Sequence, residues 1–341
     1  MRRLKLALLL VGLLTLVGLV WHIGPMRIAE AAAGLGPLAL LIILLPSVLM
    51  YALETFGWRL TLGRYAAVVA FSRLCAVRTA GEVVNMTTPI AYVGGEPLKA
   101  YLLQRSGVPL VDGLASVVTA KTTMTVAQIM FIVLGIGLAF RSLGASGASG
   151  GSSDGTVLAA AVSVGLLLAF TAVFLLVQHR GLFTGLLGLL RRLKIRIAYL
   201  EHREERLREL DRTIVNFYTR DRRGFLLSIG FCFLGWLAEA LEVYAILYFL
   251  GGPAEFLTAI SIGALSVFIK GGTFFIPGSV GAQEAGNLLL LVAFGYSDVT
   301  GLTFALLRRL RELVWIGIGL VCLAALGGKA GPVQMAEVKR G

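Results

Sequence analysis

The chain of 341 residues is long enough for two soluble domains, but 57% of its residues are hydrophobic and only 15% are charged. A mean hydropathy of +0.85 does not fit a surface that faces water, so the composition predicts an integral membrane protein and excludes a soluble catalytic domain. At about 20 apolar residues per crossing, the chain can furnish about six to eight hydrophobic segments. The net charge of +12 reflects basic cytoplasmic loops in such a protein, and nucleic-acid binding is not expected.

The N-terminal apolar run follows three basic residues and ends at Trp21. A small-residue cleavage site is missing at the distance expected for a signal peptide, which favours an uncleaved first helix. Two weaker segments, about 66–104 and 256–294, are interrupted by Pro, Gly and charged residues. Continuous hydrophobic stretches predict further membrane helices at about 36–60, 113–140, 157–178, 225–250 and 299–326.

The basic residues predict the topology. The segment 179–224 holds 12 Lys and Arg against 6 Asp and Glu, whereas 141–156 is rich in Ser and Gly. The first segment and both termini should be cytoplasmic, and the second should lie outside. Each weak segment must then return to the side that it left, as a re-entrant or tightly folded hairpin. Apolar residues at helical spacing within 179–224 predict an amphipathic helix that either packs on the bundle or binds anionic lipid.

An internal repeat relates the two halves of the chain. The unit is one helix, one broken hairpin and one helix, and an odd number of crossings between the copies inverts the second copy, which is a transporter signature. The predicted fold is therefore an all-α, polytopic membrane helix bundle with two inverted-topology repeats. The residues matched at an offset of 188 are Glu54 and Glu242, Pro89 and Pro277, Glu96 and Glu284, Gly107 and Gly295, Gly113 and Gly301, and Lys121 and Arg309.

The repeat divides the chain into five parts. They are a first transmembrane helix and loop (1–35), repeat unit 1 (36–140), a linking helix with a basic cytoplasmic segment (141–224), repeat unit 2 (225–327) and a cytoplasmic tail (328–341).

The first hairpin carries the string Gly94-Gly95-Glu96-Pro97. The two glycines let the backbone break, and Pro suits the first turn of a new helix, so a half-helix should begin near Pro97. Its free N–H groups and positive dipole end would then lie beside the Glu96 carboxylate, inside the membrane.

The second hairpin repeats the break at Pro277 and the acid at Glu284. Both acids could simply cap short helices. An acid near the centre of a membrane helix costs about 2.5–3.5 kcal/mol on insertion scales, which favours a function for both.

Basic residues are predicted to converge on these breaks. Lys121 and Arg309 are matched and need an anion, either a lipid phosphate or one of the acids. We expect Arg308, Arg311 and Glu312 on one face of the last helix, with Arg309 a turn aside. The alternative is ion pairing that only holds the bundle together. The predicted transport residues are Gly94, Gly95, Glu96, Pro97, Lys99, Lys121, Pro277, Gln283, Glu284, Arg308, Arg309 and Glu312.

Enzyme chemistry has little support. The three cysteines lie far apart in apolar runs and the three histidines have no partners at ligand spacing, so neither a metal site nor a cofactor is predicted. CxxC, HExxH and Walker-type motifs are absent from the sequence. Thr87, Thr88 and Ser279 are available as nucleophiles for an alternative function, a membrane-embedded lipid-head transferase.

The strings at residues 94–103 and 277–284, followed by the basic cluster at 308–312, resemble the flippase-like membrane family typified by the transmembrane domain of lysylphosphatidylglycerol synthases. The resemblance implies a multi-pass inner-membrane protein that moves lipids between leaflets. The basic residues Lys121 and Arg309 predict that these lipids carry an anionic or phosphate-containing headgroup. It also implies envelope-lipid biosynthetic enzymes as partners, and stand-alone members include hopanoid-associated ones. The sequence after residue 327 does not resemble an aminoacyl-transferase domain, so lysyl transfer is not expected. A non-transporting accessory subunit of an envelope-lipid pathway is the further alternative.

Overall fold

The computed structural model describes residues 34–87, 94–145, 204–273 and 281–326, together with Ser279 and scattered residues before 34. These residues form nine α-helices, one short 3₁₀ helix and no strands, which confirms the all-α prediction for this part of the chain. The elements are α3 (Gly36–Thr61), η1 (Gly63–Ala67), α4 (Phe71–Thr87), α5 (Gly95–Gln104), α6 (Leu110–Ala145), α10 (Glu204–Arg220), α11 (Arg222–Phe249), α12 (Phe256–Gly272), α13 (Ala282–Ala293) and α14 (Asp298–Leu326).

The four strong hydrophobic stretches that fall on described residues form helices. α3, α6, α11 and α14 each begin within three residues of the predicted start. The weak segments each form two short helices, α4 with α5 and α12 with α13, and α10 occupies the predicted amphipathic segment. The helices predicted at 1–35 and 157–178, and the loop 141–156, lie largely outside the described residues.

Three helices are long and apolar enough to cross a membrane: α3, α11 and the first 31 residues of α6. α3 exposes Leu38, Leu41 and Leu45 at 63–69% of their surface, as expected where lipid replaces water around a helix. α14 has 29 residues, but charged residues from Arg308 to Glu312 interrupt its apolar sequence. These charged side chains are buried against neighbouring helices, where they can be paired.

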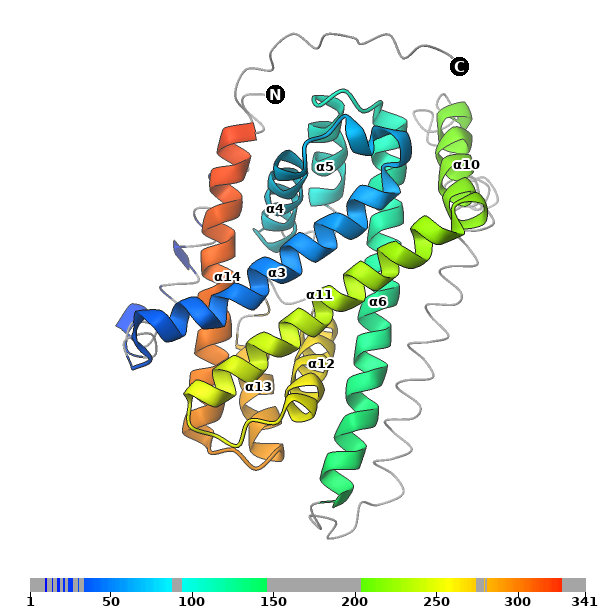
Figure 1. Cartoon of the computed structure of the whole chain (residues 1–341). Helices are drawn as coiled ribbons and strands as arrows, with labels where there is room; N and C mark the ends of the chain where they lie inside the picture. The colour runs from blue at the N-terminus through cyan, green and yellow to red at the C-terminus, as the bar shows by residue number, and fades with distance from the viewer. Residues whose placement is uncertain are drawn as a thin grey trace, which may run out of the picture.

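α3 and α11 lie side by side and run in opposite directions across the molecule (Figure 1). Small residues bring their backbones close together. A Cβ atom on Gly57 would lie 2.9 Å from the Cys232 Sγ atom, and the Ser228 hydroxyl donates to the Gly57 carbonyl oxygen at 2.9 Å. Close approach at Gly and Ser is a usual way for helices to associate in membranes, where the hydrophobic effect does not drive them together.

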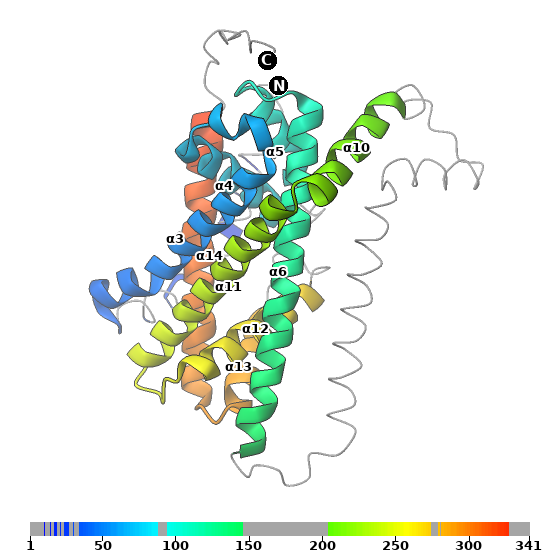
Figure 2. The same cartoon turned by 45° about the vertical axis from the view of Figure 1, so that its right-hand side comes forward.

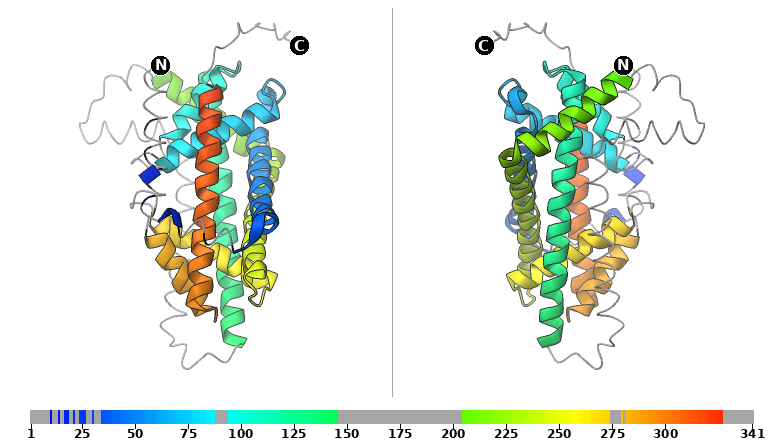
Figure 3. Two further views of the ribbon diagram at one scale, coloured as in Figure 1. Left: turned by 90° about the vertical axis from the view of Figure 1, so that its left-hand side faces the viewer. Right: turned by 90° about the vertical axis from the view of Figure 1, so that its right-hand side faces the viewer.

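The two pairs of short helices lie at opposite ends of the molecule (Figure 1). α4 and α5 lie beside the start of α6, while α12 and α13 lie near the start of α14, and these two long helices run in opposite directions (Figure 3). α6 packs against α12, as Figure 2 also shows, and α14 packs against α4. Each half of the chain therefore contributes its last helix to the packing of the other half.

The sequence offset of 188 also relates the ends of helices. It carries Thr61, the end of α3, to Phe249, the end of α11, and Leu110, the start of α6, to Asp298, the start of α14. The glycines that follow these ends and precede these starts match as well. Gly63 and Gly251 have φ of 52° and 72°, and Gly107 and Gly295 have φ of 92° and 85°. Only glycine adopts this left-handed region freely, so the matched glycines mark the same turns in both halves.

Candidate functional site

The first charged cluster joins α3, α4, α5 and α6. Lys99 on α5 bridges two acids, with its Nζ atom 2.6 Å from Glu82 Oε1 and 3.1 Å from Glu96 Oε1. Arg78 on α4 pairs with Glu54 on α3, and both side chains are buried. The first cluster consists of Glu54, Arg78, Glu82, Glu96, Lys99 and Lys121.

Asn85 connects the first cluster to the start of α5. Its Oδ1 atom accepts from the Gly95 backbone N–H at 2.7 Å, and its Nδ2 atom donates to Glu96 Oε1 at 3.0 Å. The half-helix begins two residues before Pro97, close to the predicted point. Its first N–H is satisfied by Asn85, so Glu96 is not its cap, and the Glu96 carboxylate is used for pairing with Lys99.

Gly95 has a different role from the one that the sequence indicated. Gly94 has φ of −69° and ψ of −35°, so no special backbone conformation is required there. A Cβ atom on Gly95, however, would lie 2.0 Å from the Gly81 carbonyl oxygen and 2.7 Å from Asn85 Oδ1. Gly95 is therefore needed for the close crossing of α4 and α5, because any side chain would push the two helices apart.

We expect Gly95→Ala to destabilise the protein by about 1–3 kcal/mol, the usual cost of overpacking. The Gly81 backbone cannot move aside without displacing α4, so the clash must separate the helices. Gly137→Ala on α6 is the control, since nothing lies within 4 Å of the Cβ atom that it would add. Thermal unfolding in detergent should show a lower midpoint for Gly95→Ala only, and equal midpoints for the two variants would contradict the close crossing.

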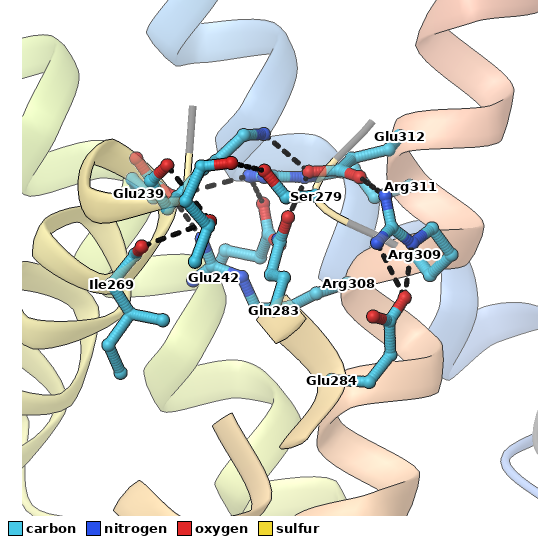
Figure 4. A network of polar contacts seen from close by, with 12 residues as sticks. Glu239, Glu242, Ile269, Ser279, Gln283, Glu284, Arg308, Arg309, Arg311 and Glu312 are labelled. Carbon is cyan, nitrogen blue, oxygen red and sulfur yellow. Dashed lines mark hydrogen bonds and ion pairs between the residues drawn. The ribbon is translucent and has the colours of Figure 1, made fainter. Parts of the chain in front are cut away.

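The second charged cluster joins α11, α12, α13 and α14 (Figure 4). Glu312 on α14 accepts from Lys270 Nζ at 2.5 Å, from Gln283 Nε2 at 3.2 Å and from Arg309 Nη1 at 2.6 Å. Arg309 also binds Glu284 on α13, with its Nε atom 2.7 Å from Glu284 Oε1. The second cluster consists of Glu239, Glu242, Lys270, Glu284, Arg308, Arg309, Arg311 and Glu312.

The charged residues of α14 divide between two faces. Arg308 pairs with Glu239, and Arg311 pairs with Glu242 at 2.7 Å, so these two arginines contact α11. Arg309 and Glu312 instead contact the α12–α13 pair. Glu312 was predicted on the face of Arg308 and Arg311, but its partners lie on other helices than theirs, on α12 and α13 and not on α11.

Glu284 has two roles at the start of α13. Its Oε2 atom accepts from the Gly281 N–H at 2.7 Å, and its Oε1 atom pairs with Arg309. The capping alternative raised by the sequence thus applies to one oxygen of Glu284. Of the two matched basic residues, Arg309 pairs with the carboxylates of Glu284 and Glu312. Lys121 lines the same cavity as the three carboxylates of the first cluster. Pro277 lies outside the described residues.

The matched acids Glu54 and Glu242 are neutralised from different helices. Arg78, on the first short helix of its half, pairs with Glu54, but Ser266 stands at the position matched to Arg78. In the second half Arg311 from α14 pairs with Glu242. Charge is therefore balanced within each cluster, with three acids and three bases in the first and four acids and four bases in the second. Buried charges require such pairing.

The sequence interpretation missed Lys270. This residue stands alone among apolar neighbours in α12, and its matched position in the first half is Glu82. The two halves thus carry opposite charges at this matched position. That reversal of charge is the signal that could have identified Lys270.

The first cluster lines a cavity between α3, α4, α5 and α6. Glu54, Trp58, Arg78 and Lys99 are among its lining residues. The cavity has about 30 Å³ open to the centres of water molecules, room for about two waters. A lipid headgroup would need more space than this.

The candidate nucleophiles form local hydrogen bonds. The Thr87 hydroxyl donates to the Val83 carbonyl oxygen at 2.8 Å, and the Ser279 hydroxyl donates to the Thr273 carbonyl oxygen at 3.3 Å. Thr88 and the three histidines lie outside the described residues. Within the described ranges, no group of three or more His, Cys, Asp or Glu residues has the arrangement of a metal site.

Comparisons with known proteins show the family to which this sequence belongs. Residues 4–319 match the family described as the lysylphosphatidylglycerol synthase TM region. A UPF0104 membrane protein of Methanothermobacter thermautotrophicus is 23% identical over 304 residues, which cover 86% of each chain. A UPF0104 membrane protein of Pyrococcus horikoshii is 23% identical over 335 residues, which cover 92% of this chain and 93% of the relative. No solved structure matches significantly.

Proposed function

Because this chain belongs to the family of the lysylphosphatidylglycerol synthase transmembrane region, we propose that it translocates a membrane lipid between the two leaflets. The observation that carries the proposal is the pair of buried charged clusters inside an apolar helical bundle. Ionisable groups at membrane depth are costly and usually mark a path for a substrate or an ion. A headgroup would pass through the clusters while the acyl chains stay in lipid.

We propose further that the two halves are inverted repeats whose short helix pairs open in turn, one to each leaflet. The shared offset of helix ends and turn glycines supports this reading, as do the opposite directions of α3 and α11. A side-chain connection between the halves also supports it. The Arg78 guanidinium lies 4.5 Å from the centre of the Tyr51 ring, and Tyr51 stacks on Trp315 of α14 at 3.7 Å.

The test of this proposal is reconstitution of the purified protein in liposomes with acyl-labelled fluorescent lipids. Added dithionite bleaches the outer leaflet, so translocation appears as additional loss of fluorescence. Empty liposomes and liposomes with an unrelated membrane protein of similar size are the controls. A lipid whose headgroup changes chemically, without faster bleaching, would instead support the transferase. If neither faster bleaching nor a change of the headgroup is observed, translocation is contradicted and an accessory subunit is favoured.

Lys121→Gln is expected to slow the movement of phosphate-containing lipids by about tenfold, since a hydrogen bond to a charged group contributes about 1.5–3 kcal/mol. Labelled diacylglycerol, which carries no phosphate, should move as in the wild type. The same liposome assay measures both lipids. If Lys121→Gln folds and moves phospholipids at the wild-type rate, Lys121 does not bind a phosphate.

We propose the inner membrane as the location, with both termini in the cytoplasm. Single cysteines introduced in 141–156 should react with an impermeant maleimide added from outside. Cysteines in 179–224 and near residue 335 should react only after the membrane is opened, because basic segments stay in the cytoplasm. A C-terminal cysteine that reacts from outside would contradict the inverted relation of the two halves.

A further inference from the structure

The cavity of the first cluster has unused hydrogen-bonding atoms of both kinds. Within the described part of the chain, Trp58 Nε1 and Arg78 Nη1 are buried donors without a partner, and Glu54 Oε1 is a buried acceptor without one. All three residues line the cavity and are no more than 5% exposed. An unsatisfied buried polar atom is unfavourable, so these atoms favour a ligand that supplies the missing partners.

The two kinds of atom require two kinds of group on the ligand. A phosphate oxygen can accept from Trp58 and Arg78, but it has no proton to donate to the free oxygen of Glu54. A protonated amine can donate to that oxygen. Without a ligand, waters can fill these roles, since the cavity has room for about two.

The charge of the cluster points to the same ligand. Three carboxylates and three basic groups make the first cluster neutral, as long as all six are ionised. A headgroup with a net negative charge would leave one uncompensated charge in a medium of low dielectric constant, which is unfavourable. A headgroup that carries both a phosphate and an ammonium group leaves the cluster neutral.

We infer that the first cluster binds a zwitterionic phospholipid headgroup whose ammonium group bears N–H donors, as in phosphatidylethanolamine. The inference rests on the proposed function and specifies its substrate class. The phosphate lies against Trp58 and Arg78 and the ammonium group against Glu54 once the α4–α5 pair opens. Phosphatidylcholine lacks the N–H donors and phosphatidylglycerol lacks the positive charge, so both fit less well.

The test compares three acyl-labelled lipids in the dithionite assay: phosphatidylethanolamine, phosphatidylcholine and phosphatidylglycerol. The wild-type protein should move phosphatidylethanolamine about tenfold faster than either other lipid, the factor that corresponds to one lost partner of about 1.4 kcal/mol. In parallel, the three lipids in short-chain form are added to the protein in detergent. Phosphatidylethanolamine should raise the midpoint of thermal unfolding most.

Variants at Glu54 sharpen the test. Glu54→Gln leaves two acids and three bases, so phosphatidylglycerol should become the preferred lipid over phosphatidylethanolamine. In the double variant Glu54→Gln/Arg78→Gln the first cluster holds two acids and two bases and is neutral again. This variant should therefore not prefer phosphatidylglycerol over phosphatidylethanolamine. Glu255→Gln removes one carboxylate from the exposed start of α12 and should keep the wild-type order.

The outcomes separate the inference from the proposed function. If no labelled lipid moves, translocation is contradicted, while the order of stabilisation in detergent still decides which headgroup binds. Equal movement and equal stabilisation by the three lipids would overturn the zwitterionic site. An unchanged lipid order in Glu54→Gln would overturn it too. Should Glu54→Gln fail to fold, the wild-type series and the charge-balanced double variant remain decisive.

Discussion

Arg311→Met is expected to lower the free energy of unfolding by about 3–5 kcal/mol, the usual cost of leaving one partner of a buried ion pair uncompensated. The Arg311 Nη1 atom lies 2.7 Å from Glu242 Oε2, and the Glu242 side chain is completely buried. Its other carboxylate oxygen has no hydrogen-bond partner among the described residues. Loss of Arg311 therefore leaves the carboxylate with little compensation beyond Arg308, which already pairs with Glu239.

A double variant separates the charge effect from lost packing. Arg311→Met/Glu242→Leu replaces the pair by apolar side chains and should recover most of the lost stability, because such exchanges are often neutral or stabilising. Arg64→Met, at an exposed site, should change stability by less than about 0.5 kcal/mol. Unfolding in mixed detergent measures all three. Equal losses in the single and double variants would contradict the ion-pair explanation.

Glu96→Gln and Glu284→Gln are each expected to slow translocation by about tenfold or more while stability stays near the wild-type value. Stability is retained because each acid shares its basic partner. Lys99 keeps Glu82 at 2.6 Å, and Arg309 keeps Glu312 at 2.6 Å. We expect translocation to fall because, in the proposed mechanism, each variant removes a carboxylate that would exchange partners when its short helix pair opens. A charge-assisted hydrogen bond of about 1.5–3 kcal/mol corresponds to this factor.

Rates from the liposome assay and unfolding midpoints from the same preparations should be measured together. Glu255→Gln is the control for loss of one carboxylate outside both clusters. Normal transport by both variants would mean that the two acids only hold helices together. A large loss of stability in either variant would show that the remaining acid does not compensate the charge of the shared basic residue.

Several elements could be predicted from local sequence because their signals are local. Unbroken apolar stretches indicated α3, α6, α11 and α14, since every backbone polar group in lipid must be satisfied within a helix. The interruptions by Gly and Pro indicated the two pairs of short helices. Matched acids at Glu96 and Glu284 pointed to the starts of α5 and α13, where both residues lie in the first helical turn.

The sequence by itself thus determined the class of protein, the strong helices and several of the residues that carry buried charge, although not Lys270, because hydropathy and helical period are properties of neighbouring residues. Only the tertiary structure decided which base meets which acid. Glu54 pairs with Arg78, 24 residues away, yet its counterpart Glu242 pairs with Arg311, 69 residues away. Such choices, like the need for Gly95 at a helix crossing, depend on how distant helices pack, and no local pattern encodes that packing.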